Sequence, residues 1–184
     1  TIARARFSVD YPARFMLIAA MNPSPCGFYN HPTRSCECTP QQVQRYLNKI
    51  SGPLLDRIDL QVEIVPVPFE KLSAIEEGES SASICERVVS ARTRQNERYK
   101  DYPDVHCNAQ MTPKLMQLYA RPDEEGLKRL KSAMDKLHLS ARAYDRILKV
   151  ARTIADLEGS EDIKSKHIAE AIQYRSLDRS SWGQ

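Results

Sequence analysis

Residues 140–159 constrain the fold of this chain more than any other segment, because they carry every signal of a long amphipathic helix. Ser140 can cap the helix, and Leu139 and Tyr144 stand at the positions of a hydrophobic staple. One face then collects apolar side chains, namely Ile147, Leu148, Ala151, Ile154 and Ala155. Gly159 ends the pattern, since glycine adopts the left-handed backbone of a helix C-terminus at little cost. The sequence therefore predicts a helix over 141–158 that packs on one side.

Further helices are predicted through most of the chain after residue 69. Ser83 and Glu86 have the spacing of a capping box. The helix that they begin has an apolar side of Ile84, Val88 and Ala91, and a basic side of Arg87, Arg92, Arg94 and Arg98. The pattern lapses over 101–107, and Thr112 before Pro113 starts another helix. Two more helices are expected over 123–137 and 164–174, the last with Ile168 and Ile172 inward.

The first 68 residues predict a mixed organisation. Residues 15–22 read FMLIAAMN, an apolar run bounded by prolines that is typical of a strand buried on both faces. Thr39 and Pro40 predict the start of a helix of about ten residues. Residues 60–65 alternate apolar and polar side chains and predict a half-exposed strand, ended by Pro66 and Pro68. The expected fold class is α+β but mostly α.

Composition limits the class of protein. With 184 residues, 41% of them hydrophobic, the chain can bury a sizeable core as one domain or two. Neither a membrane span nor a signal peptide is indicated, which favours a cytoplasmic location. The net charge of +3 is too small to mark the whole chain as a nucleic-acid binder. Five unevenly spaced cysteines favour a reducing compartment over a disulfide framework.

Three polar residues are candidates for phosphate chemistry. Asn22 follows the first predicted strand, where open α/β sheets bind ligands, and either holds a water and a phosphate oxygen or satisfies the turn before Pro23. Arg57, in LLDRID, either pairs with its flanking aspartates or reaches a nucleotide of a neighbouring subunit. Arg142 stands in the first turn of the 141–158 helix, where the helix dipole disfavours a cation. It either holds an anion there or is a solvated arginine.

A Pro- and Gly-rich loop, NPSPCGFYNHPTRSCECTP, offers a candidate metal site. Its potential ligands are Cys26, Cys36 and Cys38, with His31 as a fourth. The spacing C-x4-H-x4-C-x-C departs from the paired C-x2-C knuckles of zinc sites. Bound zinc and reduced thiols in a loop therefore both remain open.

The nucleotide-binding part of an ATPase is not recognisable in the sequence. No GxxxxGK[ST] motif occurs, and no apolar strand ends in the paired acids that would hold magnesium. This chain alone is not expected to hydrolyse ATP. Because it opens on Thr1 with TIARARFSVDYPARF, we expect it to be a segment of a longer protein.

Several stretches together resemble the magnesium-chelatase-like ComM (YifB) family of bacterial AAA+ ATPases. They are FMLIAAMNPSPCG, CECTP, SGPLLDRIDLQVEI, LSARAYDRILKVARTIADLEG and HIAEAIQYR, and the resemblance extends to about Arg179. It implies the end of an AAA+ α/β core over 1–68, connecting helices over 69–108 and a helical lid over 109–184. Walker A and Walker B, which bind ATP and Mg²⁺, would lie upstream.

The resemblance also assigns roles. Asn22 matches the sensor-1 position, Arg57 the arginine finger that acts in trans in a ring, and Arg142 sensor 2 on the lid. It implies a hexameric, ATP-driven motor that acts on DNA in branch migration during natural transformation. Alternatives are a chelatase-type subunit for metal insertion into a porphyrin, and a non-enzymatic DNA- or metal-binding module. One position departs from the family pattern of two C-x-C pairs, because Ser24 stands where the first cysteine would be.

Overall fold

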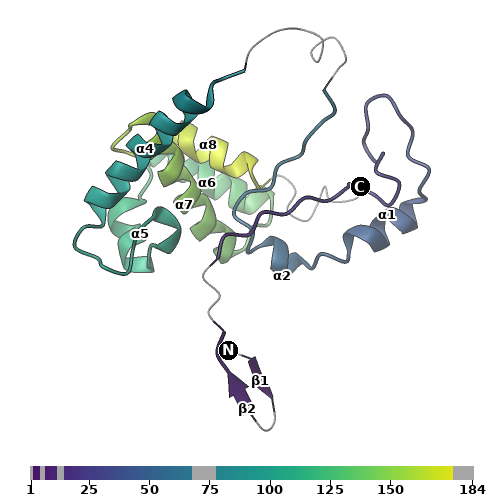
Figure 1. Ribbon diagram of the computed structural model, residues 1–184, viewed down its shortest axis with the longest axis horizontal. Helices are drawn as coiled ribbons and strands as arrows, with labels where there is room; N and C mark the ends of the chain where they lie inside the picture. Colours follow the sequence, from purple (N-terminus) through teal and green to yellow (C-terminus); the bar gives the residue numbers. More distant parts are fainter. Residues whose placement is uncertain (1, 5–6, 12–14, 68–77, 176–184) are drawn as a thin grey trace.

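The computed structural model describes residues 2–4, 7–11, 15–67 and 78–175, and this part of the chain is mostly helical. A short antiparallel hairpin, β1 (Ile2–Arg4) and β2 (Phe7–Val9), pairs Ile2 with Val9. Two short helices follow, α1 (Pro40–Leu47) and α2 (Gly52–Leu55). The remaining helices form one group beside them (Figure 1): α4 (Ser81–Arg98), the 3-10 helix η1 (Asn108–Gln110), α5 (Pro113–Tyr119), α6 (Glu124–Lys136), α7 (Ala141–Glu158) and α8 (Ser165–Gln173). The predicted mostly α fold class is confirmed.

The central helix of this group is α7, which packs against α4, α5, α8 and η1. Its bounds are those predicted from the sequence. The Ser140 hydroxyl accepts the Ala143 N–H at 3.2 Å, and Gly159 ends the helix with φ +80°, in the left-handed region. The predicted apolar face is confirmed as well, and its fully buried members are Ile147, Ala151 and Ala155. They join a single core with Leu115, Leu130, Ile163 and Ile168.

Helix starts were predicted correctly at most, but not all, positions. Thr39 forms a capping box with Gln42 at the start of α1, and the Thr112 hydroxyl accepts the Leu115 N–H at the start of α5. The start predicted at Ser83 is wrong, because the cap of α4 is Ser80, whose hydroxyl accepts the Ser83 N–H at 3.2 Å. Several serines precede this helix, and spacing alone does not distinguish the one whose backbone leaves the helix.

The two strands predicted at 15–22 and 60–65 are wrong, since both segments lack a hydrogen-bonded ladder. Their apolar side chains are exposed, among them Met16 and Ile18 (each 83%) and Ile64 (88%), whereas the polar Gln61 is buried. An extended segment becomes a strand only when a neighbour accepts and donates its backbone hydrogen bonds. Within the described residues, β1 and β2 form the only sheet, apart from an isolated bridge between Pro122 and Ile163, so neither segment finds a neighbouring strand.

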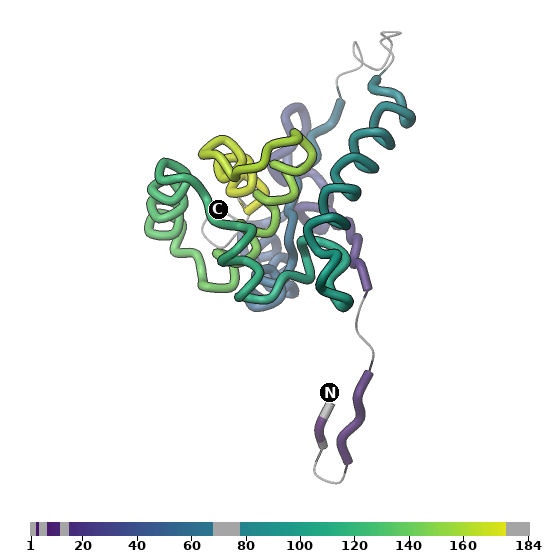
Figure 2. The backbone as a smooth tube through the Cα atoms, turned by 90° about the vertical axis from the view of Figure 1, so that its left-hand side faces the viewer, coloured from purple at the N-terminus to yellow at the C-terminus, as the bar shows by residue number. Residues whose placement is uncertain are grey.

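The helix α4 projects beyond the core at its N-terminal end, as the side view shows (Figure 2). Of the predicted apolar side, Ala91 is buried, but Ile84 and Val88 remain more than 40% exposed. The predicted basic side is also interrupted, because Arg98 turns inward to an acid of α7. Only the C-terminal half of α4 therefore belongs to the packed domain.

The buried carboxylate of Asp156, on α7, accepts hydrogen bonds from two arginines and an asparagine. Arg98 of α4 makes two hydrogen bonds to its oxygens, at 2.5 and 2.8 Å. Asn108 donates to it at 2.8 Å, and Arg152 donates at 3.1 Å. Burial alone would raise the pKa of Asp156, but the hydrogen bonds from Arg98 and Asn108 outweigh burial, and this pKa lies below its usual range. Asp156 thus joins α4, η1 and α7.

Replacing Asp156 tests this arrangement. Asp156→Ala should lower the free energy of unfolding by about 3 to 5 kcal/mol, since it leaves the buried guanidinium groups of Arg98 and Arg152 without their counter-ion. Urea unfolding followed by circular dichroism measures the change. Glu97→Ala, which removes an exposed partner of Lys100, is the matched control and should hardly move the midpoint. Equal effects of the two substitutions would contradict the role given to Asp156.

Candidate functional site

Arg57 lies on the exposed surface just after α2. Its Nη1 donates to the carbonyl oxygen of Pro53 at 2.5 Å, one turn earlier. The flanking Asp59, one of the two local partners considered from the sequence, pairs with Arg146 of α7 at 2.6 Å. The guanidinium of Arg57 therefore sits at the surface, on a segment whose neighbouring acid is engaged elsewhere.

Three contacts fasten the segment after Arg57 to the helical domain. The first is the Asp59–Arg146 ion pair. The second is a hydrogen bond from Arg175, after α8, to the carbonyl oxygen of Ile58. The third is the Gln61 N–H, which donates to the carbonyl oxygen of Tyr174 at 2.9 Å. Sequence reasoning missed these contacts, because all three join residues more than 80 positions apart. The three contacts fix the position of the 58–61 segment on α7 and on the end of α8.

Arg142 is exposed in the first turn of α7, one turn before Arg146. Residues four apart lie on the same side of a helix, so Arg142 and Arg146 share a face. The structure therefore brings the helix that carries Arg142 against the segment that follows Arg57. The first-turn N–H groups of α7 lie beside Arg142, although Ser140 already accepts the one from Ala143.

Asn22 is exposed at the start of the cysteine loop. Its side chain lies over Gly27, where an added Cβ would come 3.7 Å from the Asn22 Nδ2. Gly27 has φ +81°, a backbone that favours glycine. The described residues do not bring Asn22 to Arg57 or Arg142 in any contact. Two surface hollows lie elsewhere, one lined by residues of α1 and just after it, the other by Asp123 and Ser165. Neither is lined by Asn22, Arg57 or Arg142.

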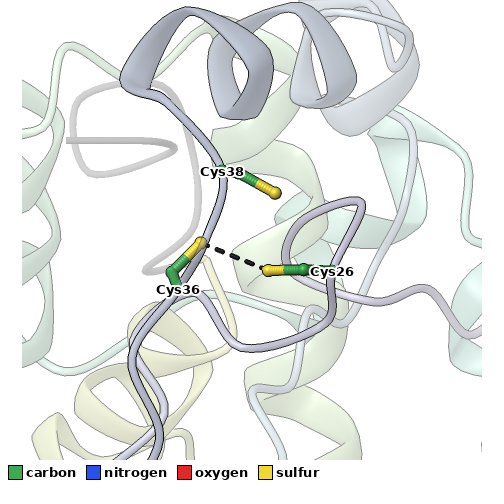
Figure 3. A group of neighbouring side chains, drawn as sticks. All are labelled: Cys26, Cys36 and Cys38. Atoms are coloured by element: carbon green, nitrogen blue, oxygen red, sulfur yellow. Dashed lines mark hydrogen bonds between the residues drawn. The ribbon is translucent and has the colours of Figure 1, made fainter.

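The cysteine loop places three thiols together. The sulfur atoms of Cys26, Cys36 and Cys38 all lie within 4.8 Å of one another, and those of Cys26 and Cys36 are 3.4 Å apart (Figure 3). A hydrogen bond from Ser24 is the main cause that lowers the pKa of Cys26 to about 6. The pKa of Cys38 is raised, first by its hydrogen bond with Cys26. The Cys26 thiol therefore ionises more easily than the Cys38 thiol.

His31 lies outside this group of thiols, contrary to its expected place as a fourth ligand. Its Nδ1 instead accepts the backbone N–H groups of Thr33 and Arg34, at 3.2 and 3.1 Å. The ring also packs edge-on against Phe28. His31 therefore organises the turn of the loop.

Three of the four arginines of α4 make contacts within the chain. Arg87 pairs with Glu79 at 2.7 Å, Arg92 donates to Gln95 at 3.0 Å, and Arg98 binds Asp156. A helix that binds DNA phosphates needs arginines free to neutralise them. A non-enzymatic DNA-binding module would bind DNA through the basic side of α4, and these three contacts argue against that function.

Among the helices of the described residues, none has both the length and the apolar composition of a membrane span.

Breaking the Asp59–Arg146 pair should loosen the 58–61 segment locally. In Arg146→Ala, we expect faster hydrogen–deuterium exchange of the Gln61 N–H, because the ion pair no longer holds Asp59 against α7. Mass spectrometry of peptides covering this segment measures the exchange. Arg142→Ala is the matched control, since it removes an exposed arginine one turn away on the same helix. Unchanged exchange in Arg146→Ala would show that the ion pair does not hold the segment.

Comparison with known proteins identifies the relatives of this chain. Residues 78–175 match the family model of the magnesium chelatase subunit ChlI C-terminal domain, and residues 1–72 match that of magnesium chelatase subunit ChlI. The chain is 45% identical to YifB of Salmonella typhimurium over 181 residues, and 43% identical to the competence protein ComM of Haemophilus influenzae over 179 residues. Each alignment covers 97% of this chain and 34% of the relative.

A more distant relative aligns over almost the same share of this chain. A Mycobacterium bovis protein, Mb2921c, is 36% identical over 174 residues, which are 95% of this chain and 34% of that protein. The chain thus spans about a third of the length of the curated relatives that it matches. It belongs to the magnesium chelatase ChlI family, among relatives of the ComM (YifB) type.

Proposed function

We propose that this chain is the C-terminal portion of an AAA+ ATPase of the ComM type, a hexameric, ring-shaped motor in the cytoplasm that acts on DNA. Membership of the family supports the ATPase part of the proposal. The DNA part rests on the resemblance to the ComM family, one of whose members is named a competence protein. ATP and Mg²⁺ would be held by residues outside this chain, and Mg²⁺ would neutralise charge on the phosphates.

The observation that supports the proposal is the Asp59–Arg146 ion pair, because it joins the segment after Arg57 to the helix that carries Arg142. The Asp59–Arg146 pair holds the segment after Arg57 against α7, whose first turn presents Arg142. In the proposed ring, Arg57 of one subunit stabilises the charge that develops on the phosphoryl group transferred in its neighbour. Arg142 holds a phosphate oxygen beside the start of α7. Asn22 orients a water or a phosphate oxygen through its amide.

Arg57→Ala in the full-length protein tests the arginine finger. ATP turnover should fall by about 10³-fold or more, because removing a finger arginine removes stabilisation that arises only in the transition state. Binding of a fluorescent ATP analogue should change little. Arg45→Ala, an exposed arginine on α1, is the matched control and should keep normal turnover. Normal turnover in Arg57→Ala would reject the assignment.

Mixing two inactive variants tests whether Arg57 acts in trans. The upstream residues are expected to contain GxxxxGK[ST], whose lysine can be replaced to abolish ATP binding. Subunits with that replacement still carry Arg57, and Arg57→Ala subunits still bind ATP. Mixed rings should therefore regain part of the ATPase activity at interfaces that combine the two intact parts. Absence of the motif upstream, or no recovery on mixing, would contradict the ring mechanism.

A chelatase-type ATPase subunit for metal insertion is a second candidate, favoured by the description of the matching family model. It would use the same arginines with a different partner. Stimulation of the full-length ATPase by branched or single-stranded DNA supports the DNA motor, whereas activity indifferent to DNA supports the chelatase. A non-enzymatic DNA-binding module is the third candidate, and the internal pairing of the α4 arginines speaks against it.

A further inference from the structure

The cysteine loop brings together a group of soft metal ligands from both of its ends. Cys26 lies near the start of the loop, while Cys36 and Cys38 lie directly before Thr39, the cap of α1. Figure 3 shows the three thiols converging on one space between these two parts of the backbone. The described thiols are free of disulfides. The evidence for this group does not depend on the nucleotide site proposed above.

The spacing of the sulfur atoms suits a tetrahedral cation. With zinc–sulfur bonds of about 2.3 Å, two tetrahedral ligands lie about 3.8 Å apart. The observed separation of 3.4 Å between Cys26 and Cys36, and the 4.8 Å limit on all three, bracket that value. Small side-chain adjustments would bring the three sulfurs to equal distances from one ion.

Ser24 places a hydroxyl group beside two of the three thiols. Its hydroxyl oxygen is 3.3 Å from the Cys26 sulfur and 3.9 Å from the Cys36 sulfur, and the residue is fully buried. The same oxygen accepts the N–H groups of Gly27 and Tyr29, at 3.1 and 3.3 Å. With both lone pairs engaged in this way, the hydroxyl hydrogen is left to point toward a thiolate.

We propose that Cys26, Cys36 and Cys38 bind one divalent cation, for which Zn²⁺ is best suited, and that His31 is not the fourth ligand; Ser24 instead supports the thiolates through a hydrogen bond. The three thiols lose their protons to solvent when the ion binds, and the resulting thiolates supply the ligand bonds. Ser24 donates a hydrogen bond to the Cys26 thiolate, which leaves the fourth coordination position to water. The ion would tie the loop after Asn22 to the start of α1, and so fix the position of Asn22.

Cobalt(II) titration of the reduced full-length protein tests the ligand set, because cobalt replaces zinc and its absorption bands report the number of bound thiolates. We expect one equivalent to produce thiolate-to-cobalt charge-transfer and tetrahedral d–d bands, and zinc to displace it. Metal analysis after purification in excess zinc should give one zinc per chain above a Cys26→Ser/Cys36→Ser/Cys38→Ser control. Comparison with that control also subtracts any metal bound by cysteines elsewhere in the protein.

Variants of Ser24 and His31 test which of these two residues contributes to the metal site. Ser24→Cys should add a thiolate, strengthen both sets of bands and tighten binding by roughly tenfold or more. Ser24→Ala should keep the stoichiometry and weaken binding by about tenfold, as loss of a hydrogen bond to a ligand does. His31→Asn keeps an acceptor near the Nδ1 position, lacks Nε2 and should leave the spectrum unchanged.

Several outcomes would overturn the proposal. A His31→Asn spectrum that loses intensity as Cys38→Ser does would make His31 a ligand. A wild-type protein that binds no more cobalt or zinc than the triple-serine control would show that the thiols hold no metal. A Cys26–Cys36 disulfide that persists under the same reducing conditions would assign the pair to redox chemistry instead. Because ATP turnover is not a readout here, these results stand apart from the test of Arg57.

Discussion

The pairing of Asp156 with Arg98 is the interaction on which the helical domain depends. A carboxylate this deeply buried is tolerated only when cations and hydrogen-bond donors surround it. Arg98, Asn108 and Arg152 do so from α4, from η1 and from α7 itself. Arg152 also donates to the carbonyl oxygens of Ser160 and Glu161, both at 2.6 Å. One charge therefore fixes α7 relative to the loop that leads into α8.

A rigid α7 has consequences at its other end. The helix runs from the ion cluster near Gly159 to the turn that carries Arg142 and Arg146. Because a packed helix transmits a displacement along its length, any movement of α7 on nucleotide binding would move Asp59 through Arg146. The segment that follows Arg57 would move with it. Arg146 is thus a positioning residue in the proposed mechanism. It connects the helix that carries Arg142, which would hold a phosphate oxygen, to the segment after Arg57, which would act on the nucleotide of the neighbouring subunit.

The helical half of the fold was predictable because its signals are local. Ser140, Thr112 and Thr39 cap helices that begin where the sequence indicates, and Gly159 ends α7 as expected. Strands depend on partners far away in the sequence, and the alternation in 60–65 carries no information about whether a partner is present. Long-range contacts such as Asp59–Arg146 were invisible for the same reason. Both residues looked like surface charges until the fold brought them together.

The cysteine loop shows how far residue type alone can mislead. His31 is a better zinc ligand than serine by chemistry, and the sequence places it conveniently between the cysteines. Its Nδ1 is nevertheless occupied by the backbone of Thr33 and Arg34, so the ring is oriented by the turn. Ser24, which looked like a lost ligand, is buried against Cys26 and Cys36. At this position the resemblance to the ComM family expects a cysteine, and the structure places the Ser24 hydroxyl beside two of the remaining thiols. A serine there weakens the proposed metal site but does not abolish it, since the three cysteine ligands remain within reach of one ion.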